Sequence, residues 1–595
     1  MLELHNIVKT YGEKRALDNF SLQLENGLYG LLGENGAGKS TLIKILTCNL
    51  KQDEGSILMD GRGVREMGLT LAQREYIDCF IKCLPDCFDA RTHLIFGAVD
   101  WHCDLFVNGR YAGSHDGGYT PFRTDITPFL RADGEQELIL RVEDTLRCDQ
   151  LRGKQSWEKE PSRCWYTPST GIWQSVWLER VPDNPIQSIH ITPNLPQSEI
   201  RCEISLNKPP KKDGQFKIDV QYQGHPVAAL TYKTKQMNVD LSVPIQPEDY
   251  IDEIHYWTPE HPNLYDVTVS YASDGQTDQV FTYFGFRDVC TRDGKTLLNH
   301  RPIYQRLILH QGYYDGGLLT ADTDERYRTD LQTIKDMGFN GVRMHQKIED
   351  PLFYYWADKI GLLVWGELPS CYEFSELAMC RSFESMREFI QRDYNHPSIV
   401  CWVPLNESWG VRNIEQNTAQ QRYAVSLYHF IKAMDSTRWV STNDGWEQVT
   451  TDFCTLHDYS FDGKALSSRW DDLDALLQSA AQDRMIFASG YQYTGQPILL
   501  TEFGGVAFKT NQSEKDWGYC AIEKNEASYI RRLTSLFSYI KTNRRIQGYC
   551  YTQFTDVMQE TNGLLSIRRE PKIAIDVIRA ILFGTDDSEP LSPVP

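Results

Sequence analysis

The sequence predicts a multidomain protein in which two β-sandwiches precede a (β/α)8 barrel, with a small α/β segment at the N-terminus. Three observations support this fold class. Residues after 287 alternate short apolar segments with amphipathic ones, residues 69–286 hold many short strand patterns bounded by turn signals, and residues 1–68 contain a glycine-rich loop. The chain of 595 residues is long enough for several domains.

These changes of pattern divide the chain into five parts. We expect a phosphate-loop fragment, a first all-β sandwich, an immunoglobulin-like sandwich, a barrel and a short acidic tail. The corresponding residues are 1–68, 69–182, 183–286, 287–585 and 586–595.

The N-terminal part contains the loop Gly33-Glu-Asn-Gly-Ala-Gly-Lys-Ser-Thr41. In such a loop the backbone N–H groups hold phosphates, the lysine neutralises them and the serine reaches Mg²⁺. The candidate nucleotide-binding residues are Gly33, Gly36, Gly38, Lys39, Ser40 and Thr41. With Tyr11, Gly55-Ser-Ile and Asp60-Gly61, the segment resembles the start of an ABC-transporter ATPase domain.

That resemblance ends near residue 68, without the signature motif or the acidic strand end that would complete an ATPase. We therefore expect a vestigial fragment in which ATP binding has no function. The other reading is a nucleotide-binding, transporter-associated protein that uses the rest of the chain to recognise sugar.

Short alternating segments predict the two sandwiches. In the first, Cys103-Asp-Leu-Phe-Val-Asn-Gly109 ends in the hairpin signal Asn-Gly, and the pattern continues in Gly171-Ile-Trp-Gln-Ser-Val-Trp-Leu-Glu179. In the second, Tyr265-Asp-Val-Thr-Val-Ser270 alternates apolar and polar residues.

Eight candidate strands predict the barrel, and helical segments fall between most of them. One such helix spans 382–394, where Phe383, Met386, Phe389 and Ile390 mark an apolar face. The candidate strands are Tyr304–His310, Gly341–Met344, Leu362–Trp365, Val400–Leu405, Val440–Thr442, Phe453–His457, Ile498–Thr501 and Gly548–Thr552.

Composition excludes several classes of function. A formal net charge of −20 and a pI of about 5.2 disfavour general binding to nucleic acid or to anionic membranes. No apolar run is long enough to insert into a membrane, and the N-terminus lacks a signal-peptide pattern. Fifteen cysteines without a CxxC pair indicate reduced thiols, so we expect a cytoplasmic protein.

Two glutamates follow buried strand patterns directly. Glu407 ends Ile399-Val-Cys-Trp-Val-Pro-Leu-Asn-Glu407, and Glu502 ends Pro497-Ile-Leu-Leu-Thr-Glu502. Carboxylates at the C-terminal ends of barrel strands are placed for an active site rather than for a core. Two such carboxylates at one barrel mouth can act as acid/base and nucleophile on a glycosidic bond. The alternative is that either glutamate is an exposed ion-pair partner at a strand end, with no catalytic role.

Residues 76–583 resemble glycoside hydrolase family 2, which contains β-galactosidases and β-glucuronidases. The resemblance rests on motifs found in the family's order. They are Gly97-Ala-Val-Asp, Val107-Asn-Gly, Gly171-Ile-Trp-Gln, Phe284-Gly-Phe-Arg287, Val364-Trp-Gly-Glu367, Asn406-Glu407-Ser408, Thr501-Glu-Phe-Gly504 and Gln559-Glu-Thr-Asn-Gly-Leu-Leu565.

The resemblance implies a retaining exo-β-glycosidase with Glu502 as nucleophile and Glu407 as acid/base. We expect the two carboxyl groups ~5 Å apart and the pKa of Glu407 raised by burial and by the nearby negative charge. The resemblance also implies that the N-terminal strands of the jelly roll are missing, because the ABC-like segment occupies their place. A catalytically silent carbohydrate-binding protein on the same fold is a further alternative.

Polar and aromatic residues at the other strand ends are candidates for binding sugar. For each of them a structural role, such as a strand-end cap or a buried aromatic ring, is the alternative. In place of the family's Arg-x-x-His the chain has Arg343-Met-His345, which weakens the case for the histidine. The candidates are Asn406, His457, Tyr459, Arg343, His345, Trp365, Glu367, Trp409, Asp444, Trp446, Gln553 and Gln311.

The expected substrate is a neutral β-hexoside such as a β-galactoside. Glucuronidases of the family hold the uronic carboxylate with an Asn-x-Lys motif, and here Asn562 is followed by Gly563-Leu564. We expect no required cofactor and see no metal-ligand spacing, although some family members use Mg²⁺ or Na⁺. The sequence leaves the oligomeric state open, a homo-oligomer included.

Overall fold

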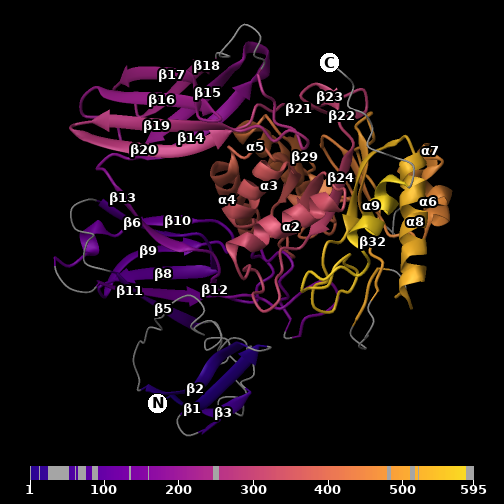
Figure 1. Cartoon of the computed structure of the whole chain (residues 1–595), viewed down its shortest axis with the longest axis horizontal. Helices are drawn as coiled ribbons and strands as arrows, with labels where there is room; N and C mark the ends of the chain where they lie inside the picture. Colours follow the sequence, from indigo (N-terminus) through magenta and orange to yellow (C-terminus); the bar gives the residue numbers. More distant parts are fainter. Residues whose placement is uncertain are drawn as a thin grey trace. The chain divides into compact units, whose positions relative to one another are not determined.

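The computed structural model describes residues 2–11, 14–24, 53–59, 62–63, 76–83, 91–132, 136–158, 160–245, 254–478, 484–508, 516–519 and 522–584 (Figure 1). The chain forms two compact units. The first unit comprises Met1–Leu146 with Ser169–Val181, and the second, here called the barrel unit, comprises Arg147–Pro168 with Pro182–Pro595. The predicted phosphate loop Gly33–Thr41 and the tail 586–595 lie outside the described residues.

An antiparallel sheet forms from the N-terminal segment, with strand order β2-β1-β3-β4. Leu4, Ile7, Val8 and Leu17 are buried in it. The strands are β1 (Leu2–Tyr11), β2 (Lys14–Leu24), β3 (Glu54–Met59) and β4 (Arg62–Gly63).

The rest of the first unit is a β-sandwich, as predicted. One sheet has the order β10-β6-β13, another β5-β11-β8-β9, and β7 pairs with β12. The predicted hairpin turn at Asn108-Gly109 joins β8 to β9, and both residues have positive φ (52° and 75°), as a type I′ turn requires. The elements are β5 (Tyr76–Cys83), β6 (Arg91–Phe96), β7 (Val99–Asp100), β8 (His102–Val107), β9 (Arg110–Asp116), β10 (Phe122–Asp125), η2 (Thr127–Phe129), β11 (Gln136–Glu143), β12 (Gly171–Ile172) and β13 (Val176–Val181).

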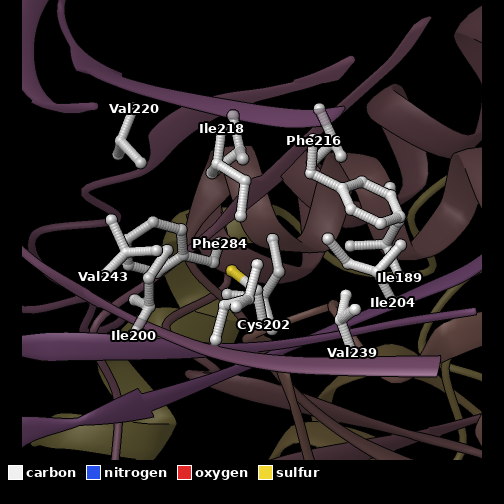
Figure 2. Packing of buried hydrophobic residues seen from close by; sticks show 14 of the residues in the cluster. Ile189, Ile200, Cys202, Ile204, Phe216, Ile218, Val220, Val239, Val243 and Phe284 are labelled. Atoms are coloured by element: carbon white, nitrogen blue, oxygen red, sulfur yellow. The ribbon is translucent and has the colours of Figure 1, made fainter. Parts of the chain in front are cut away.

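The second sandwich begins the continuous part of the barrel unit. Its sheets have the orders β14-β15-β18 and β17-β16-β19-β20, and their inward side chains form the core shown in Figure 2. Strict alternation on β16 buries Phe216, Ile218 and Val220 against the other sheet. The elements are β14 (Ile186–Asn194), η3 (Leu195–Gln197), β15 (Glu199–Leu206), β16 (Gly214–Tyr222), β17 (His225–Thr234), β18 (Asn238–Pro244), β19 (Tyr265–Ser273) and β20 (Gln276–Phe284).

A small antiparallel sheet then leads into the barrel, whose strands have the order β29-β27-β26-β25-β24-β33-β32-β31 and pair in parallel. A short parallel pair, β28 and β30, extends two of the strands at the barrel mouth. The strands of the small sheet are β21 (Val289–Arg292), β22 (Lys295–Leu298) and β23 (Arg301–Pro302). The barrel strands are β24 (Gln305–His310), β25 (Gly341–Met344), β26 (Leu363–Glu367), β27 (Ile399–Val403), β28 (Leu405–Asn406), β29 (Trp439–Val440), β30 (Asn443–Asp444), β31 (Cys454–Asp458), β32 (Ile498–Gly504) and β33 (Ile546–Thr552).

Helices connect most of these strands. The predicted helix is part of α4, and Met386, Phe389 and Ile390 are fully buried on its inner face. Ser375 begins it as a cap that accepts the N–H of Ala378. The helices are α2 (Asp324–Asp336), α3 (Pro351–Ile360), α4 (Glu376–Asp393), α5 (Thr418–Met434), α6 (Gly463–Trp470), α7 (Leu473–Gln478), α8 (Glu526–Thr542) and α9 (Ile575–Phe583).

All eight predicted barrel strands are present, with ends that differ by a few residues, so the predicted multidomain fold class is confirmed. The cysteines whose side chains the structure describes are free thiols, which agrees with the predicted reduced state. Among the described residues, no helix combines the length and the apolar character needed to cross a bilayer.

Candidate active site

Glu407 follows directly after β28 at the barrel mouth. Glu407 and Ser408 both have positive φ (50° and 54°), a costly conformation for residues with side chains. The surroundings hold it, because the Glu407 N–H donates to the carbonyl of Asp444 (3.0 Å) and the Ser408 N–H donates to the Asn443 side chain (2.9 Å). The Glu407 side chain is 16% exposed, so it reaches the mouth while lying mostly in protein.

Glu502 lies within β32, and its carboxylate accepts hydrogen bonds on both oxygens. Arg343 Nη1 donates to Oε1 (3.0 Å), and the Tyr459 hydroxyl donates to Oε2 (2.5 Å). One carboxyl oxygen of Glu407 and one of Glu502 lie within 4.8 Å of each other, together with a nitrogen of His457. The fold therefore brings the two glutamates into one site, as the sequence predicted.

Arg343 is the central cation of this site and is fully buried. Its guanidinium bonds to Glu367 and Glu502 and donates to the Asn406 side chain (2.6 Å). It also lies 3.0 Å from an oxygen of Asp444. Because it joins carboxylates from several strands, Arg343 fixes the position of the nucleophile candidate rather than projecting into open space.

His457 bridges two carboxylates at the end of β31. Its Nδ1 lies 2.8 Å from Glu407 Oε1, and its Nε2 lies 2.9 Å from Asp444 Oδ2. Burial lowers the pKa of the ring, but the charge of Glu502 and the hydrogen bonds to Asp444 and Glu407 raise it to about 10. Gly445 leaves room for the ring, because a Cβ there would lie 2.5 Å from it.

The charged imidazole corrects one expectation about Glu407. Burial alone would raise the pKa of this carboxyl, but the hydrogen bond and charge of His457, with Lys154 and Arg343, lower it. The expected rise was therefore wrong, because the nearest charge is positive rather than negative. In the resting site the proton lies on His457, next to Glu407.

Asn406, Asp444, Glu367 and His345 all lie at the strand ends where the sequence placed them, and all are buried. The charge of Arg343 and the bond from His457 lower the pKa of Asp444 against its burial. His345 Nδ1 lies 2.9 Å from Glu367 Oε2. Burial, followed by the charges of Lys154 and Arg343, lowers its pKa well below 6.5, so this ring is neutral.

Aromatic rings group beside Glu407. Trp409 lies 6.4 Å from Trp446 and 5.3 Å from Tyr372, measured between ring centroids. Trp165 packs edge-on against Trp409 at 5.2 Å. Sequence reasoning found the first two rings but missed Tyr372 and Trp165, which belong to loops that carry no strand-end signal.

Trp365 corrects a second expectation, since it is no sugar platform. It is fully buried inside the barrel, stacks on Phe453 at 5.3 Å and donates its indole N–H to Gln305 (2.9 Å). Residues two apart on a strand share a face, so Trp365 lies one layer below Glu367 in the barrel interior.

Gln311 and Gln553 are buried and bonded to each other (2.9 Å). The Gln553 amide also donates to the Asn562 side chain (2.7 Å). This chain of amides supports the mouth at the junction of β24 and β33. Direct sugar contact by either residue stays a prediction.

Segment Arg147–Pro168 belongs to the barrel unit although it lies between two stretches of the first unit. The Tyr166 hydroxyl donates to Glu560 Oε2 (2.5 Å), and both residues are buried. Asp149 pairs with Arg381 (2.9 Å). Sequence reasoning placed no site residue in this segment, and no motif in it could have revealed these contacts.

Glu407, His457 and Glu502 lie close enough to surround a cation. The imidazole, however, has both nitrogens engaged with carboxylates, and its raised pKa keeps both protonated. A protonated imidazole has no lone pair to give a metal. The donor set therefore fits a proton-sharing cluster better than a metal centre, and the cofactor expectation stays a prediction.

The fold and this carboxylate pair at the barrel mouth define the class of the protein, which has the architecture of the barrel glycoside hydrolases. The chain belongs to glycoside hydrolase family 2. Residues 289–580 match the family's TIM barrel domain, residues 184–287 match its central domain under the description "Glycosyl hydrolases family 2", and residues 85–182 match its sugar binding domain. Residues 17–88 match "ABC transporter", in agreement with the predicted N-terminal fragment.

Curated relatives carry two kinds of name. A putative beta-glucuronidase of Formosa agariphila is 29% identical over 54% of this chain and 38% of its own length. A beta-galactosidase of Thermoanaerobacter pseudethanolicus is 29% identical over 53% of this chain and 42% of its own length. The chain thus spans about two fifths of the length of these relatives.

Solved structures support the same fold. A GH2 beta-galacturonidase from Eisenbergiella tayi gives a TM-score of 0.68 at 21% identity, covering 85% of this chain and 88% of that one. The beta-glucuronidase of Parabacteroides merdae gives 0.69 at 17% identity, covering 85% of this chain and 68% of that one.

Proposed function

We propose that this protein is a retaining exo-β-glycosidase that releases a terminal β-linked hexopyranose by double displacement. The observation that carries the proposal is the approach of the Glu407 and Glu502 carboxyl oxygens to within 4.8 Å. Retaining glycosidases hold their carboxyl groups ~5–5.5 Å apart, whereas inverting enzymes leave ~6.5–9.5 Å for a water molecule.

In the first step, Glu502 attacks the anomeric carbon while Glu407 gives a proton to the departing oxygen. The bonds from Arg343 and Tyr459 hold the Glu502 carboxylate in a fixed orientation. In the second step, Glu407 takes a proton from water, and the water oxygen displaces Glu502 from the sugar. Glu407 thereby regains the proton that it gave up, and the site returns to its resting state when this proton passes back to His457.

His457 holds the proton that Glu407 needs in the first step. Glu407 is ionised in the resting site, but the imidazolium proton lies on Nδ1, 2.8 Å from Glu407 Oε1. Transfer of that proton produces the acid that the first step needs. Because the two groups share one proton, they titrate as a pair.

The names of the relatives leave two classes of glycone open. Some are β-galactosidases, which agrees with the neutral sugar expected from the sequence, and others are β-glucuronidases or β-galacturonidases. The exo mode is included because these names denote release of a single sugar.

The test is hydrolysis of p-nitrophenyl β-glycosides bearing galactose, glucose, galacturonate and glucuronate. We expect turnover of at least one of them, with proton NMR showing the β-anomer as first product. Glu502→Gln should lower turnover by at least about a thousandfold, whereas the same change at the exposed Glu526 should leave it unchanged. An α-anomer as first product, or an active Glu502→Gln variant, contradicts the proposal.

A further inference from the structure

Lys154 is a buried lysine on whose pKa the charges of the candidate catalytic carboxylates act. It is 6% exposed and lies in segment Arg147–Pro168. Backbone bonds fix the residues before it, because the N–H groups of Arg152 and Gly153 both donate to the carbonyl of Ser370 (3.0 Å). The Tyr372 hydroxyl donates to the carbonyl of Gly153 (2.5 Å), which joins the segment to the aromatic group at the mouth.

The residue is fixed from the other side as well. Its carbonyl accepts the N–H of Tyr166 (2.8 Å), and the Tyr166 hydroxyl donates to Glu560. Burial lowers the pKa of the Lys154 ammonium, but the neighbouring Cys164 and the negative charges of Glu560, Glu407 and Glu502 raise it. The lysine is therefore charged and lies in the electrostatic field of the candidate nucleophile and acid.

No carboxylate among the described residues lies in direct contact with this ammonium. The side-chain hydrogen bond recorded for it joins the Cys164 thiol, and burial raises the pKa of that thiol to about 11, so the partner is neutral. Among the described residues, no carboxylate oxygen forms an ion pair with Lys154 within 4.0 Å. A buried charge without a contacting counter-charge is costly, and it suits a ligand that supplies one.

Lys347 shows how this fold satisfies a lysine that has only a structural role. Its ammonium donates to Glu349 (2.5 Å) and to the carbonyls of Gly312 and Leu319 (both 2.8 Å). All three of its protons have acceptors within the protein. Among the described residues Lys154 has no such set of acceptors, although it too is buried, with 6% of its surface exposed against 2% for Lys347.

We propose that Lys154 binds the carboxylate of the sugar, so that the glycone is a hexuronic acid rather than a neutral hexose. The inference rests on the proposed glycosidase function and assigns its substrate class. It replaces the neutral sugar expected from the missing Asn-x-Lys motif, because a lysine from a different segment supplies the cation. Galacturonate and glucuronate both carry the required group.

The first experiment compares the kcat/KM values of uronides with those of neutral glycosides. kcat/KM is measured for the p-nitrophenyl β-galacturonide, glucuronide, galactoside and glucoside with the wild type, Lys154→Met and Lys154→Arg. We expect uronides to be preferred by the wild type, and the ratio of uronide to neutral kcat/KM to fall about a hundredfold or more in Lys154→Met. Lys154→Arg should retain much of the ratio, and the exposed Lys359→Met should retain all of it.

A lysine that only adjusted the pKa of Glu407 would slow every glycoside alike and leave the ratio unchanged, which would overturn the proposal. If Lys154→Met fails to fold, the charge is removed from the substrate instead. The methyl ester of the preferred uronide should then be hydrolysed by the wild type about a hundredfold more slowly than the free acid. Equal rates would overturn the proposal.

Calorimetric binding of free galacturonate, glucuronate and galactose separates this inference from the proposed function. Hydrolysis of neutral glycosides without uronide turnover or uronate binding supports the glycosidase and overturns the role of Lys154. Uronate binding that Lys154→Met abolishes, in a protein that hydrolyses no glycoside, supports Lys154 and overturns the glycosidase.

Discussion

Replacing His457 with glutamine should move the alkaline limb of the pH profile of kcat/KM to lower pH. Burial lowers the pKa of the wild-type ring, but Glu502 and the bonds to Asp444 and Glu407 raise it from 6.5 to about 10. That difference corresponds to roughly 4 to 5 kcal/mol in favour of the charged ring. In the wild type, the proton that Glu407 needs is therefore retained until the pH approaches 10.

In His457→Gln, Glu407 must hold the proton by itself. Loss of the imidazolium removes the largest influence that lowers its pKa, so the pKa of Glu407 rises. Even so, a buried glutamate reaches only ~8 to 9. The alkaline limb of kcat/KM should consequently move down by at least about one pH unit.

The assay is a pH profile of kcat/KM on the best substrate, with re-assay at neutral pH to show that the enzyme survives alkaline exposure. Tyr459→Phe is the matched control, because the hydroxyl that it removes donates to Glu502 (2.5 Å). Its alkaline limb should stay with that of the wild type. If the alkaline limb of His457→Gln coincides with that of the wild type, His457 and Glu407 do not share the catalytic proton.

Three further outcomes follow from the same geometry. Tyr459→Phe should lower kcat about 10- to 100-fold, because a charge-assisted bond to Glu502 contributes about 1.5–3 kcal/mol; unchanged kcat contradicts this. Trp365→Phe should lower the free energy of unfolding by about 1–3 kcal/mol, because the bond to Gln305 is lost, and should leave KM unchanged. A raised KM with normal stability would instead indicate that Trp365 contacts the sugar. Arg343→Met should cost about 3–5 kcal/mol in unfolding experiments, because the buried carboxylates lose their charged partner; a fully stable variant would argue against the network.

Much of the site was predictable because strand ends converge. Glu407, His457 and Glu502 each follow a short apolar segment, and parallel strands of one barrel bring their C-terminal ends to the same mouth. Pattern and topology together therefore placed residues far apart in sequence into one cluster. The strand ends differed by a few residues because buried strands end where pairing ends, not where hydrophobicity does.

The failures have equally physical causes. Trp365 lies on a strand buried on both faces, where no alternation in the sequence distinguishes the barrel interior from its mouth. The lowered pKa of Glu407 depends on its distance to His457, which no motif encodes. Lys154 was missed because its neighbour Glu560 is remote in sequence and its segment has no regular secondary structure.

Segment Arg147–Pro168 has an evolutionary consequence. Both of its ends continue into the first unit, yet its side chains complete the barrel mouth. Recombination that exchanged residues before 182 between relatives would also exchange this part of the mouth, including Lys154. Specificity in such chains would be inherited with the sandwich gene segment rather than with the barrel that carries the two glutamates.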